Sequence, residues 1–454
     1  MHRMKFFASL LALALLVPAG AFAQSVDTGD ANFTRYVALG DSLTAGFASG
    51  ALVESFQRRS YPALIWRQAT NGAAGFEQPL VSQPGIGGTP GFGVLQLVSL
   101  VPLTLRPVAG NGQPLNLNLP RPYNNMAVPG ADVVDLVSTT QGGINDLILR
   151  RTGFTQLQQG LSLQPTFVTL WIGNNDALGA ATSGIVNDQT LTPLPVFEQA
   201  YRTAAAAIAQ VGARMAVANI PDVTSIPYVT TIPRVVVNPQ TSQPVLGPNG
   251  QPIPLIGPNG PLGAGDFVLL PASALLAQGF GLPPGIPGSN GQPLPDGAVL
   301  SANEVATIRA RVQGYNAVIR AVATERNAAF VDANAELTRL ATTGVNIGGI
   351  TYSGAFLTGG VFSYDGVHPN AFGYAYLANL FIEAINDRFG GEIPLVNLYP
   401  FVFGGSTVGS TAASIAEESV PFIYTLEARR SLLKALNVPQ RVIDGKPRRR
   451  GGRG

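Results

Sequence analysis

Two short runs of mostly apolar, strand-forming residues constrain the fold of this chain more than any other feature. The runs are Phe167–Ile172 and Met215–Ile220, and the Ala-rich helical segment Phe197–Val211 lies between them. A strand that lacks alternating polar residues is buried on both faces, as in a parallel sheet covered by helices. Strand, helix, strand is the repeating unit of such a sheet. The sequence therefore predicts an α/β fold.

A third strand-type run places a serine on a turn. Tyr36–Leu39 is apolar, Gly40 and Asp41 interrupt the run, and Ser42 follows directly. Open α/β sheets hold their sites at the carboxyl ends of the strands. Ser42 is therefore a candidate nucleophile, and the alternative is that its side chain only caps the next helix.

Two long Gly- and Pro-rich segments, 71–121 and 223–300, separate these core elements. Neither segment has a clear helical or strand period, so we expect both to be insertions. Ser301–Glu304 then matches a capping box, which predicts a long helix and the return of the core. A short strand is expected at Ala329–Asp332 and a last core helix at Phe372–Phe389.

The predicted main domain spans residues 24–391, followed by a C-terminal extension, 392–445, with a helical stretch near Tyr424–Leu436. Residues 1–23 have the layout of a secretory signal peptide, with basic residues before an apolar run too short to span a bilayer comfortably. We expect an exported protein, periplasmic or extracellular, with no transmembrane span in its mature chain. The sequence contains no cysteine, which excludes disulfides and a lipid-anchored cysteine.

The charge balance argues against a nucleic-acid partner. Residues 24–445 carry 21 basic and 26 acidic side chains, a formal charge of −5. The last residues, 446–454, are basic, and we expect them to form a disordered tail. The sequence gives no indication of the oligomeric state.

His368 is the only histidine once residues 1–23 are removed, which makes it the candidate general base at neutral pH. Asp365 lies three residues before it, where its carboxylate could hold the imidazole in the tautomer that accepts a serine proton. The alternative is a histidine with only a packing or surface role. A single histidine also argues against a zinc site, and we expect neither a metal nor a cofactor.

Four short blocks follow one another along the chain: Gly40–Leu43, Asn125–Gly130, Gly173–Asp176 and Asp365–His368. Their order resembles that of the GDSL/SGNH hydrolase superfamily of esterases and lipases, and the resemblance runs from about residue 33 to 389. It implies a three-layer α/β/α fold of flavodoxin-like type with five parallel strands.

The resemblance also implies roles for five residues. Ser42 matches the nucleophile, while Asp365 and His368 match the acid and the base of a catalytic triad. Gly130 and Asn175 match oxyanion-hole donors, together with the backbone N–H of Ser42. Fixed donors of this kind stabilise the charge that forms on an ester carbonyl oxygen under attack.

These features predict an exported serine esterase or lipase that cleaves carboxylic esters, on small molecules or lipids, through an acyl-serine intermediate. Short-to-medium acyl chains are the expected substrates. A carbohydrate O-acetylesterase could use the same triad, and a non-catalytic surface or binding protein could keep the same fold.

The two insertions are expected to form the acyl pocket. Phe92–Val108 has Arg106 as its only charged residue, and Phe267–Pro287 has none. Exposed apolar surface of that extent usually binds something, so both segments are expected to line a channel over Ser42. The alternative is that they pack on the core or on each other as satellite clusters.

Overall fold

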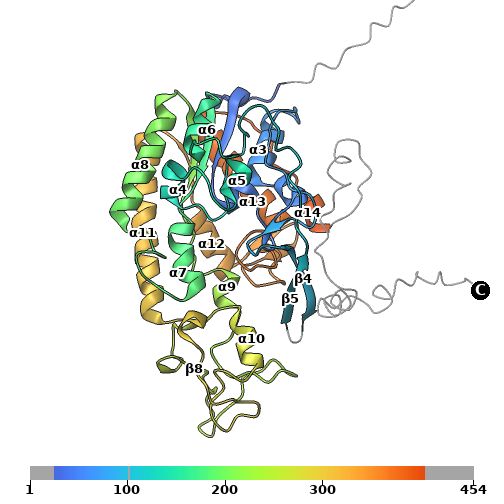
Figure 1. Ribbon diagram of the computed structural model, residues 1–454, viewed down its shortest axis with the longest axis vertical. Helices are drawn as coiled ribbons and strands as arrows, with labels where there is room; N and C mark the ends of the chain where they lie inside the picture. The colour runs from blue at the N-terminus through green and yellow to red at the C-terminus, as the bar shows by residue number, and fades with distance from the viewer. Residues whose placement is uncertain (1–24, 101–102, 404–454) are drawn as a thin grey trace, which may run out of the picture.

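The computed structural model describes residues 25–100 and 103–403 (Figure 1). The expected signal peptide, the basic tail and the expected helix at 424–436 lie outside the described residues.

A parallel sheet forms the centre of the molecule. Its strands are β1 (Tyr36–Gly40), β6 (Phe167–Trp171), β7 (Arg214–Ala218) and β12 (Ala329–Val331), in that spatial order. All three neighbouring pairs are parallel, and Gly40 at the end of β1 pairs with Trp171 at the end of β6. The strand predictions are confirmed, and the strand ends share one edge of the sheet.

The position of a fifth strand, on the free side of β1, is taken by residues 123–128. This segment makes one parallel bridge, between Ala38 and Asn125. It follows β1 through three hydrogen bonds, from the N–H groups of Ala38, Met126 and Val128 to carbonyl oxygens across the pair. The described sheet therefore has four strands plus this bridged segment, in the chain order 2-1-3-4-5 of flavodoxin-like folds.

Helices cover both faces of the sheet, which gives three layers (Figure 1). One face packs against α3 (Tyr61–Ala69) and α13 (Ala371–Phe389). The other packs against α4 (Val133–Ser138), α6 (Gln156–Ser162), α8 (Leu194–Gln210) and α11 (Ala302–Glu325). Successive strand residues alternate between the two cores, as the pleat requires. Val37, Leu39, Val168, Leu170, Met215 and Val217 lie in one core, and Tyr36, Ala38, Phe167, Trp171, Ala216 and Ala218 in the other.

The expected capping box is present at the start of α11, where Ser301 and Glu304 bond each other's backbone N–H. The remaining helices are α1 (Ser42–Ala45), α2 (Glu54–Gln57), α5 (Asn145–Ile148), α7 (Asn175–Ser183), α9 (Pro227–Thr230), α10 (Ala272–Ala277), α12 (Ala333–Thr342) and α14 (Tyr399–Phe403), with 3-10 turns η1 (Phe33–Arg35) and η2 (Asp296–Ala298). A short hairpin of β13 (Val345–Ile347) and β14 (Ile350–Tyr352) precedes α13. None of the helices within the described ranges has both the length and the apolar character needed to cross a membrane.

The first insertion forms a hairpin of β4 (Phe92–Leu100) and β5 (Leu103–Ala109). At its base, β3 (Ile86–Gly87) pairs with β2 (Ala51–Leu52), just after the Ser42 block. The hairpin packs on the body of the protein through Val94 and through Leu97, which lies against Tyr364.

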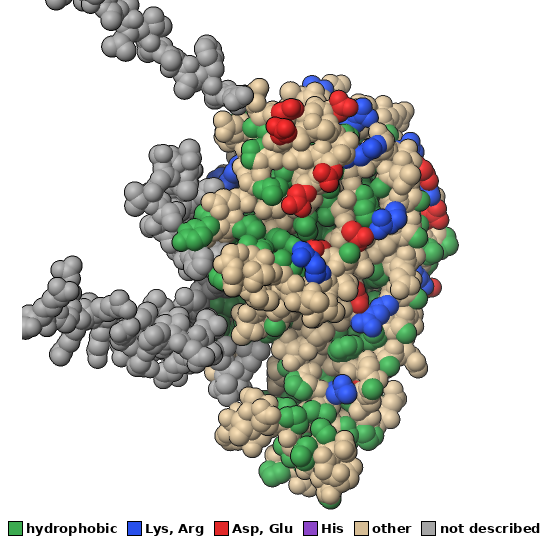
Figure 2. Space-filling view, turned by 180° about the vertical axis from the view of Figure 1, so that it is seen from behind, with side chains coloured by type: hydrophobic (Ala, Val, Ile, Leu, Met, Phe, Trp, Pro, Cys, Tyr) green, Lys and Arg blue, Asp and Glu red, His purple; other side chains and the backbone are tan. Residues whose placement is uncertain are grey.

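The second insertion forms a lobe at one end of the molecule (Figure 1). It contains β8 (Ile256–Gly257), β9 (Gly260–Pro261), β10 (Phe267–Val268) and β11 (Val299–Leu300), besides α9 and α10. Its core consists of its own residues: Val236, Leu255, Leu262, Val268, Ala272, Leu294, Ala298 and Val299. Figure 2 shows charged side chains of both signs over the body of the protein and few on the lobe.

The start of the C-terminal extension belongs to the core, which its irregular sequence did not indicate. Ile393 and Val396 are buried against α13. Asn379 of α13 bonds the backbone N–H and carbonyl of Val396 with its side chain.

Candidate active site

Ser42 lies where β1 ends and α1 begins. The cap of α1 is Asp41, whose carboxylate accepts the N–H of Leu43 at 3.0 Å. Gly40 has no room for a side chain, because a Cβ there would lie 2.3 Å from the carbonyl oxygen of Trp171. Since Asp41 takes the capping role, the Ser42 hydroxyl is left for another partner.

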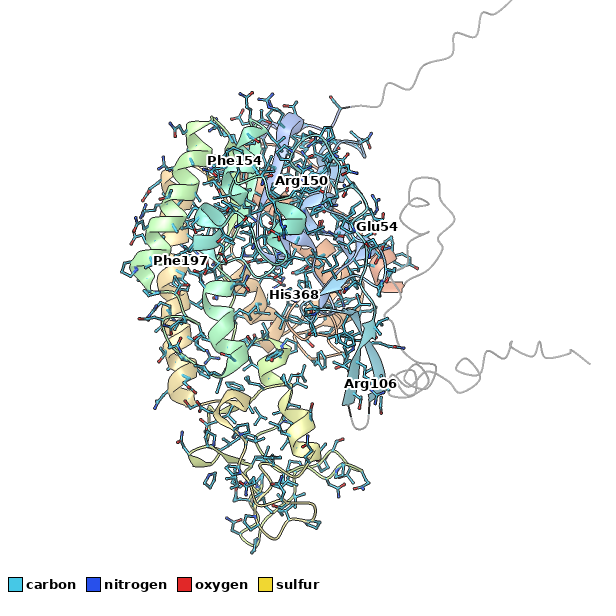
Figure 3. The ribbon with its side chains drawn as sticks, in the orientation of Figure 1. Glu54, Arg106, Arg150, Phe154, Phe197 and His368 are labelled. Atoms are coloured by element: carbon cyan, nitrogen blue, oxygen red, sulfur yellow. The ribbon has the colours of Figure 1, made fainter. Side chains whose placement is uncertain are left out.

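That partner is His368. The Ser42 Oγ lies 2.8 Å from His368 Nε2, and His368 Nδ1 lies 2.9 Å from Asp365 Oδ2. The side chains of His368 and Asp365 are 12% and 13% exposed. The Phe47 ring packs on the imidazole with ring centroids 4.9 Å apart. Figure 3 places His368 between the helices of the body and the β4–β5 hairpin, which carries Arg106. The structure therefore brings the three predicted triad residues into one hydrogen-bonded chain.

Asp365 is held by more donors than His368 alone. Its Oδ1 accepts the N–H groups of Val367 and His368 at 2.9 and 2.8 Å, and the Ser363 hydroxyl at 3.1 Å. Its Oδ2 also accepts the Gly50 N–H at 2.9 Å. Burial opposes ionisation of Asp365, but the charge of His368 and these hydrogen bonds hold the pKa of the carboxyl below its usual value. The acid is therefore ionised at neutral pH, as a triad requires.

Gly130 and Asn175 follow the two segments that flank β1 in the sheet. Gly130 follows the bridged segment beside β1, and Asn175 is the first residue of α7, just past the end of β6. The Asn175 Nδ2 donates to the carbonyl of Ala131 at 2.8 Å, which joins the two blocks and orients the amide. Within the described part of the chain, the N–H groups of Ser42 and Gly130 have no acceptor. These groups are therefore available to a substrate oxygen.

Two polar residues near the site were not predicted to contribute. Asn174 donates from Nδ2 to Asp41 Oδ2 at 2.8 Å, which ties the Gly173–Asp176 block to the Ser42 turn. Burial raises the pKa of Asp41 to about 6. Asp176 accepts the Val133 N–H at 2.9 Å, which makes it a structural acceptor, and burial raises its pKa to about 8. The paired asparagines of this block were the sequence signal for Asn174.

A small apolar pocket of about 80 Å³ has sequence neighbours of the triad, but no triad residue, in its lining. Leu43 and Val367, the neighbours of Ser42 and His368, both line it. Its other lining residues come mainly from the core elements: Trp171, Pro221, Ile226, Ala333, Glu336, Leu337, Leu340, Val361, Phe362, Pro369, Gly373, Tyr376 and Leu377.

The two insertions contribute little to the lining of this pocket, although we expected them to form the acyl channel. Only Ile226 in the pocket lining comes from either insertion. The side chains of Leu275, Leu276, Phe280 and Leu282 pack on the lobe's own core. For these residues the arrangement is the satellite cluster named above as the alternative, because their apolar side chains cover the lobe's own interior.

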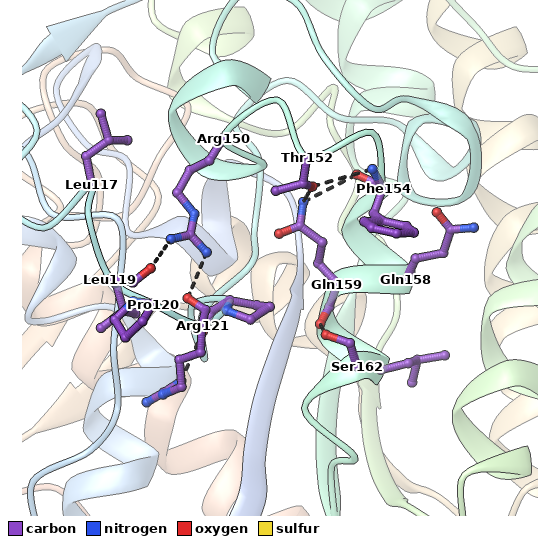
Figure 4. Close-up of a pocket in the computed structure, with 12 residues that line it drawn as sticks. Leu117, Leu119, Pro120, Arg121, Arg150, Thr152, Phe154, Gln158, Gln159 and Ser162 are labelled. Atoms are coloured by element: carbon purple, nitrogen blue, oxygen red, sulfur yellow. Dashed lines mark hydrogen bonds between the residues drawn. The ribbon is translucent and has the colours of Figure 1, made fainter.

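A larger cavity, of about 870 Å³, lies elsewhere and is lined by none of the predicted site residues (Figure 4). Arg150 on its wall donates to the carbonyls of Leu119 and Arg121 and stacks over Tyr123. These contacts join the end of the first insertion to the segment before α6. Within the described ranges, no group of three or more His, Asp or Glu side chains is arranged to hold a metal ion.

Comparison with known proteins connects this site to a family. The family model described as GDSL-like Lipase/Acylhydrolase matches residues 36–381. No curated protein matches the chain.

Among solved structures, an acetylxylan esterase from Geobacillus stearothermophilus is 14% identical, covers 77% of this chain and 93% of its own, and has a TM-score of 0.34. An extracellular lipase from Streptomyces rimosus is 17% identical, covers 78% and 98%, and has a TM-score of 0.31. A GDSL-like lipase from Parabacteroides merdae is 12% identical, covers 78% and 96%, and has a TM-score of 0.34.

Proposed function

The chain belongs to the GDSL-like lipase/acylhydrolase family and is a carboxylic ester hydrolase, and from this premise we propose that Ser42, His368 and Asp365 form its catalytic triad. The observation that carries the proposal is the hydrogen-bonded chain from Ser42 Oγ through His368 to Asp365, with contacts of 2.8 and 2.9 Å.

In the first half of the reaction, Ser42 Oγ attacks the ester carbonyl carbon and its proton passes to His368 Nε2. The N–H groups of Ser42 and Gly130 and the Asn175 amide bind the oxyanion of the tetrahedral intermediate. When the intermediate collapses, His368 gives the proton to the departing alcohol, which leaves the acyl group on Ser42.

In the second half, His368 takes a proton from a water molecule, which attacks the acyl carbon of the Ser42 ester. The same donors bind the second oxyanion. Its collapse returns the proton from His368 to Ser42 Oγ and releases the carboxylic acid. Throughout, the ionised Asp365 stabilises the imidazolium and fixes its tautomer.

The small pocket lined by Leu43 and Val367, the sequence neighbours of Ser42 and His368, supports a preference for short acyl chains. A cavity needs about 10–15 Å³ to hold one water molecule. A pocket of about 80 Å³ therefore has room for an acyl chain of a few carbon atoms. Each methylene buried there adds up to about 0.8 kcal/mol of binding until the pocket is full. The proposed substrates are therefore esters of short-to-medium acids. The proposal that the enzyme is exported rests on the expected signal peptide.

Two measurements test this function. Fluorophosphonate labelling of the purified protein, followed by peptide mapping, should modify Ser42, whereas an unlabelled Ser42 would favour a non-catalytic protein on this fold. A series of p-nitrophenyl esters from acetate to palmitate should give a kcat/KM maximum at a short chain beyond acetate. A sharp maximum at acetate would favour the carbohydrate O-acetylesterase instead.

A further inference from the structure

A tight turn, Ala48–Ala51, lies between the Ser42 helix and the first insertion. Ala48 and Ala51 exchange backbone hydrogen bonds of 3.1 and 3.2 Å, which leaves Ser49 and Gly50 as a two-residue loop. Their φ angles are +51° and +80°, so both are left-handed, as a type I′ turn requires. Asn or Gly usually fills the first position, and a buried serine there is unusual enough to suggest a specific role.

The turn directs its two consecutive N–H groups at the catalytic acid and its neighbour. The Ser49 N–H donates to Ser363 Oγ at 2.8 Å, and the Gly50 N–H donates to Asp365 Oδ2 at 2.9 Å. In return, the Ser49 Oγ lies 3.3 Å from the backbone N–H of Tyr364 and accepts it. Successive N–H groups in such a conformation form a concave site that favours negative charge.

Ser363 bonds the second oxygen of the Asp365 carboxylate, the one that the turn does not contact. Its hydroxyl donates to Asp365 Oδ1 at 3.1 Å, and the Ser49 N–H occupies one of its lone pairs. Because Ser49 can only donate through that N–H, the Ser363 hydrogen is directed to Asp365. Ser363 is 1% exposed, so water does not compete for either bond.

The turn is itself fixed by the first insertion. The Leu95 N–H of β4 donates to the Ser49 carbonyl at 2.7 Å, and the Gly88 N–H donates to the Gly50 carbonyl at 3.3 Å. Leu97 of the same strand packs on Tyr364, next to Asp365. The insertion is thus continuous, through backbone hydrogen bonds, with the groups that hold the acid.

We propose that Ser49, Gly50 and Ser363 form an acid clamp, a set of positioning residues through which the first insertion fixes the orientation and charge of Asp365. This inference rests on the proposed function. With the clamp intact, each carboxylate oxygen has donors besides His368, so the carboxylate cannot rotate away from the imidazole. The first insertion therefore supports the catalytic base, in addition to any contact with substrate.

Removing the Ser363 hydroxyl should change the chemistry of the acid and leave substrate binding unaltered. Ser363→Ala is expected to lower kcat by about tenfold or more, the usual effect of one lost hydrogen bond to a charged group, with KM unchanged. With one donor fewer, Asp365 attracts the imidazolium more strongly, so the acid limb of the kcat/KM profile should move to higher pH. Asp41 and Tyr374 are the other titratable groups facing the pair, and both are the same in wild type and variant.

Ser301→Ala is the matched control, because it also removes a serine hydroxyl that bonds a carboxylate, here Glu304 in the cap of α11, and should lower stability alone. Its melting temperature should fall while its kcat and acid limb stay at wild-type values. Should Ser363→Ala fail to fold, Ser363→Cys keeps the shape with a much weaker donor and should show the same shift of the acid limb.

The clamp is refuted if the folded Ser363 variant keeps the wild-type kcat and acid limb, or loses only stability as the control does. A wild-type protein that neither hydrolyses esters nor reacts with fluorophosphonate at Ser42 would overturn the proposed function instead. The two failures are therefore distinguishable.

Discussion

Asp41, and not Ser42, caps helix α1, and this division of roles between adjacent residues is what leaves the serine hydroxyl to His368. The side-chain oxygen of a serine that caps a helix normally accepts a hydrogen bond from a backbone N–H. Here the neighbouring carboxylate satisfies the orphan N–H of Leu43, and Asn174 satisfies the second carboxylate oxygen. The bond that positions the nucleophile is thus the one to His368.

Substitution of any member of the hydrogen-bonded triad should abolish turnover without unfolding the protein. Ser42→Ala and His368→Ala are each expected to lower kcat/KM by about four or more orders of magnitude, and Asp365→Asn by a similar amount because it favours the wrong tautomer. Steady-state kinetics with p-nitrophenyl butyrate and circular dichroism are the measurements. Ser138→Ala, an exposed serine, is the control. Near-normal activity of His368→Ala would show that the triad assignment is wrong.

The Asn175 amide should contribute to kcat and little to substrate binding. We expect Asn175→Ala to lower kcat by about a hundredfold or more with KM changed little, because its second N–H bonds the oxygen only when that oxygen is charged. Asn145→Ala is the matched variant, since it also removes a bond from Nδ2 to a backbone carbonyl. Equal effects of the two substitutions would contradict an oxyanion role.

Asp176 should act through stability alone. Burial raises its folded pKa to about 8, well above the unfolded value, so folding takes up a proton between about pH 4 and 8. This contribution to stability is fully present at low pH and is lost as the pH rises towards 8. Asn can keep the acceptor for the Val133 N–H without a charge, so Asp176→Asn should gain stability relative to wild type between pH 5 and pH 8. Urea unfolding of both proteins at several pH values measures this, and a pH-independent difference would contradict it.

The sequence predicted the site residues that stand in short contiguous blocks. The spacing of Asp365 and His368 within one turn was visible, as were the asparagines after β6. The bonds from Ser49 to Ser363 and from Asn174 to Asp41 were not, because they join residues 314 and 133 positions apart. Such contacts depend on how the loops meet at the sheet edge, and no local pattern encodes that.

The elements of the core follow from the sequence more directly than the loops do. The apolar runs of β1, β6 and β7 are each buried on both faces, so their lack of alternation was sufficient to identify them. The insertions have no period to indicate which side chains point inward. Their leucines were therefore assigned to a substrate channel, whereas those of residues 275–282 cover the lobe's own core.

Helix α12 offers a direct test of the pocket that Leu43 and Val367 line, because its first residue, Ala333, lines the same pocket. Ala333→Leu fills much of the pocket, and we expect it to lower kcat/KM for butyrate and hexanoate esters while the acetate ester is affected least. Ala335→Leu, exposed on the same helix, is the control and should keep the wild-type profile. An unchanged chain-length profile in Ala333→Leu would place the acyl chain elsewhere.

The molecule as a whole consists of a layered body and a lobe that is built around a separate core. The lobe contacts the body at the catalytic turn, Asp365–His368, which carries the acid and the base of the triad. Tyr228 in α9 donates its N–H to the Gly366 carbonyl at 2.9 Å, and Leu270 donates to the Tyr228 carbonyl at 2.8 Å. Leu270 also packs against Gly366: a Cβ added at Gly366 would lie only 3.3 Å from Leu270 Cδ2. The lobe can therefore influence His368 through its base, independently of its distal part.

Substitutions at the two ends of the lobe should consequently have different effects. Phe280→Ala opens a cavity in the lobe core, and we expect faster hydrogen exchange over residues 253–294 with the ester chain-length profile unchanged, because Phe280 contacts the lobe cluster and does not line the pocket. Leu270→Ala removes the contact with the catalytic turn, so it should lower kcat by about tenfold while the distal lobe keeps its protection. Hydrogen exchange and kinetics on both variants measure the two effects together. If Phe280→Ala shifts the chain-length optimum, the distal lobe reaches the substrate, and the acyl channel expected from its composition would be restored.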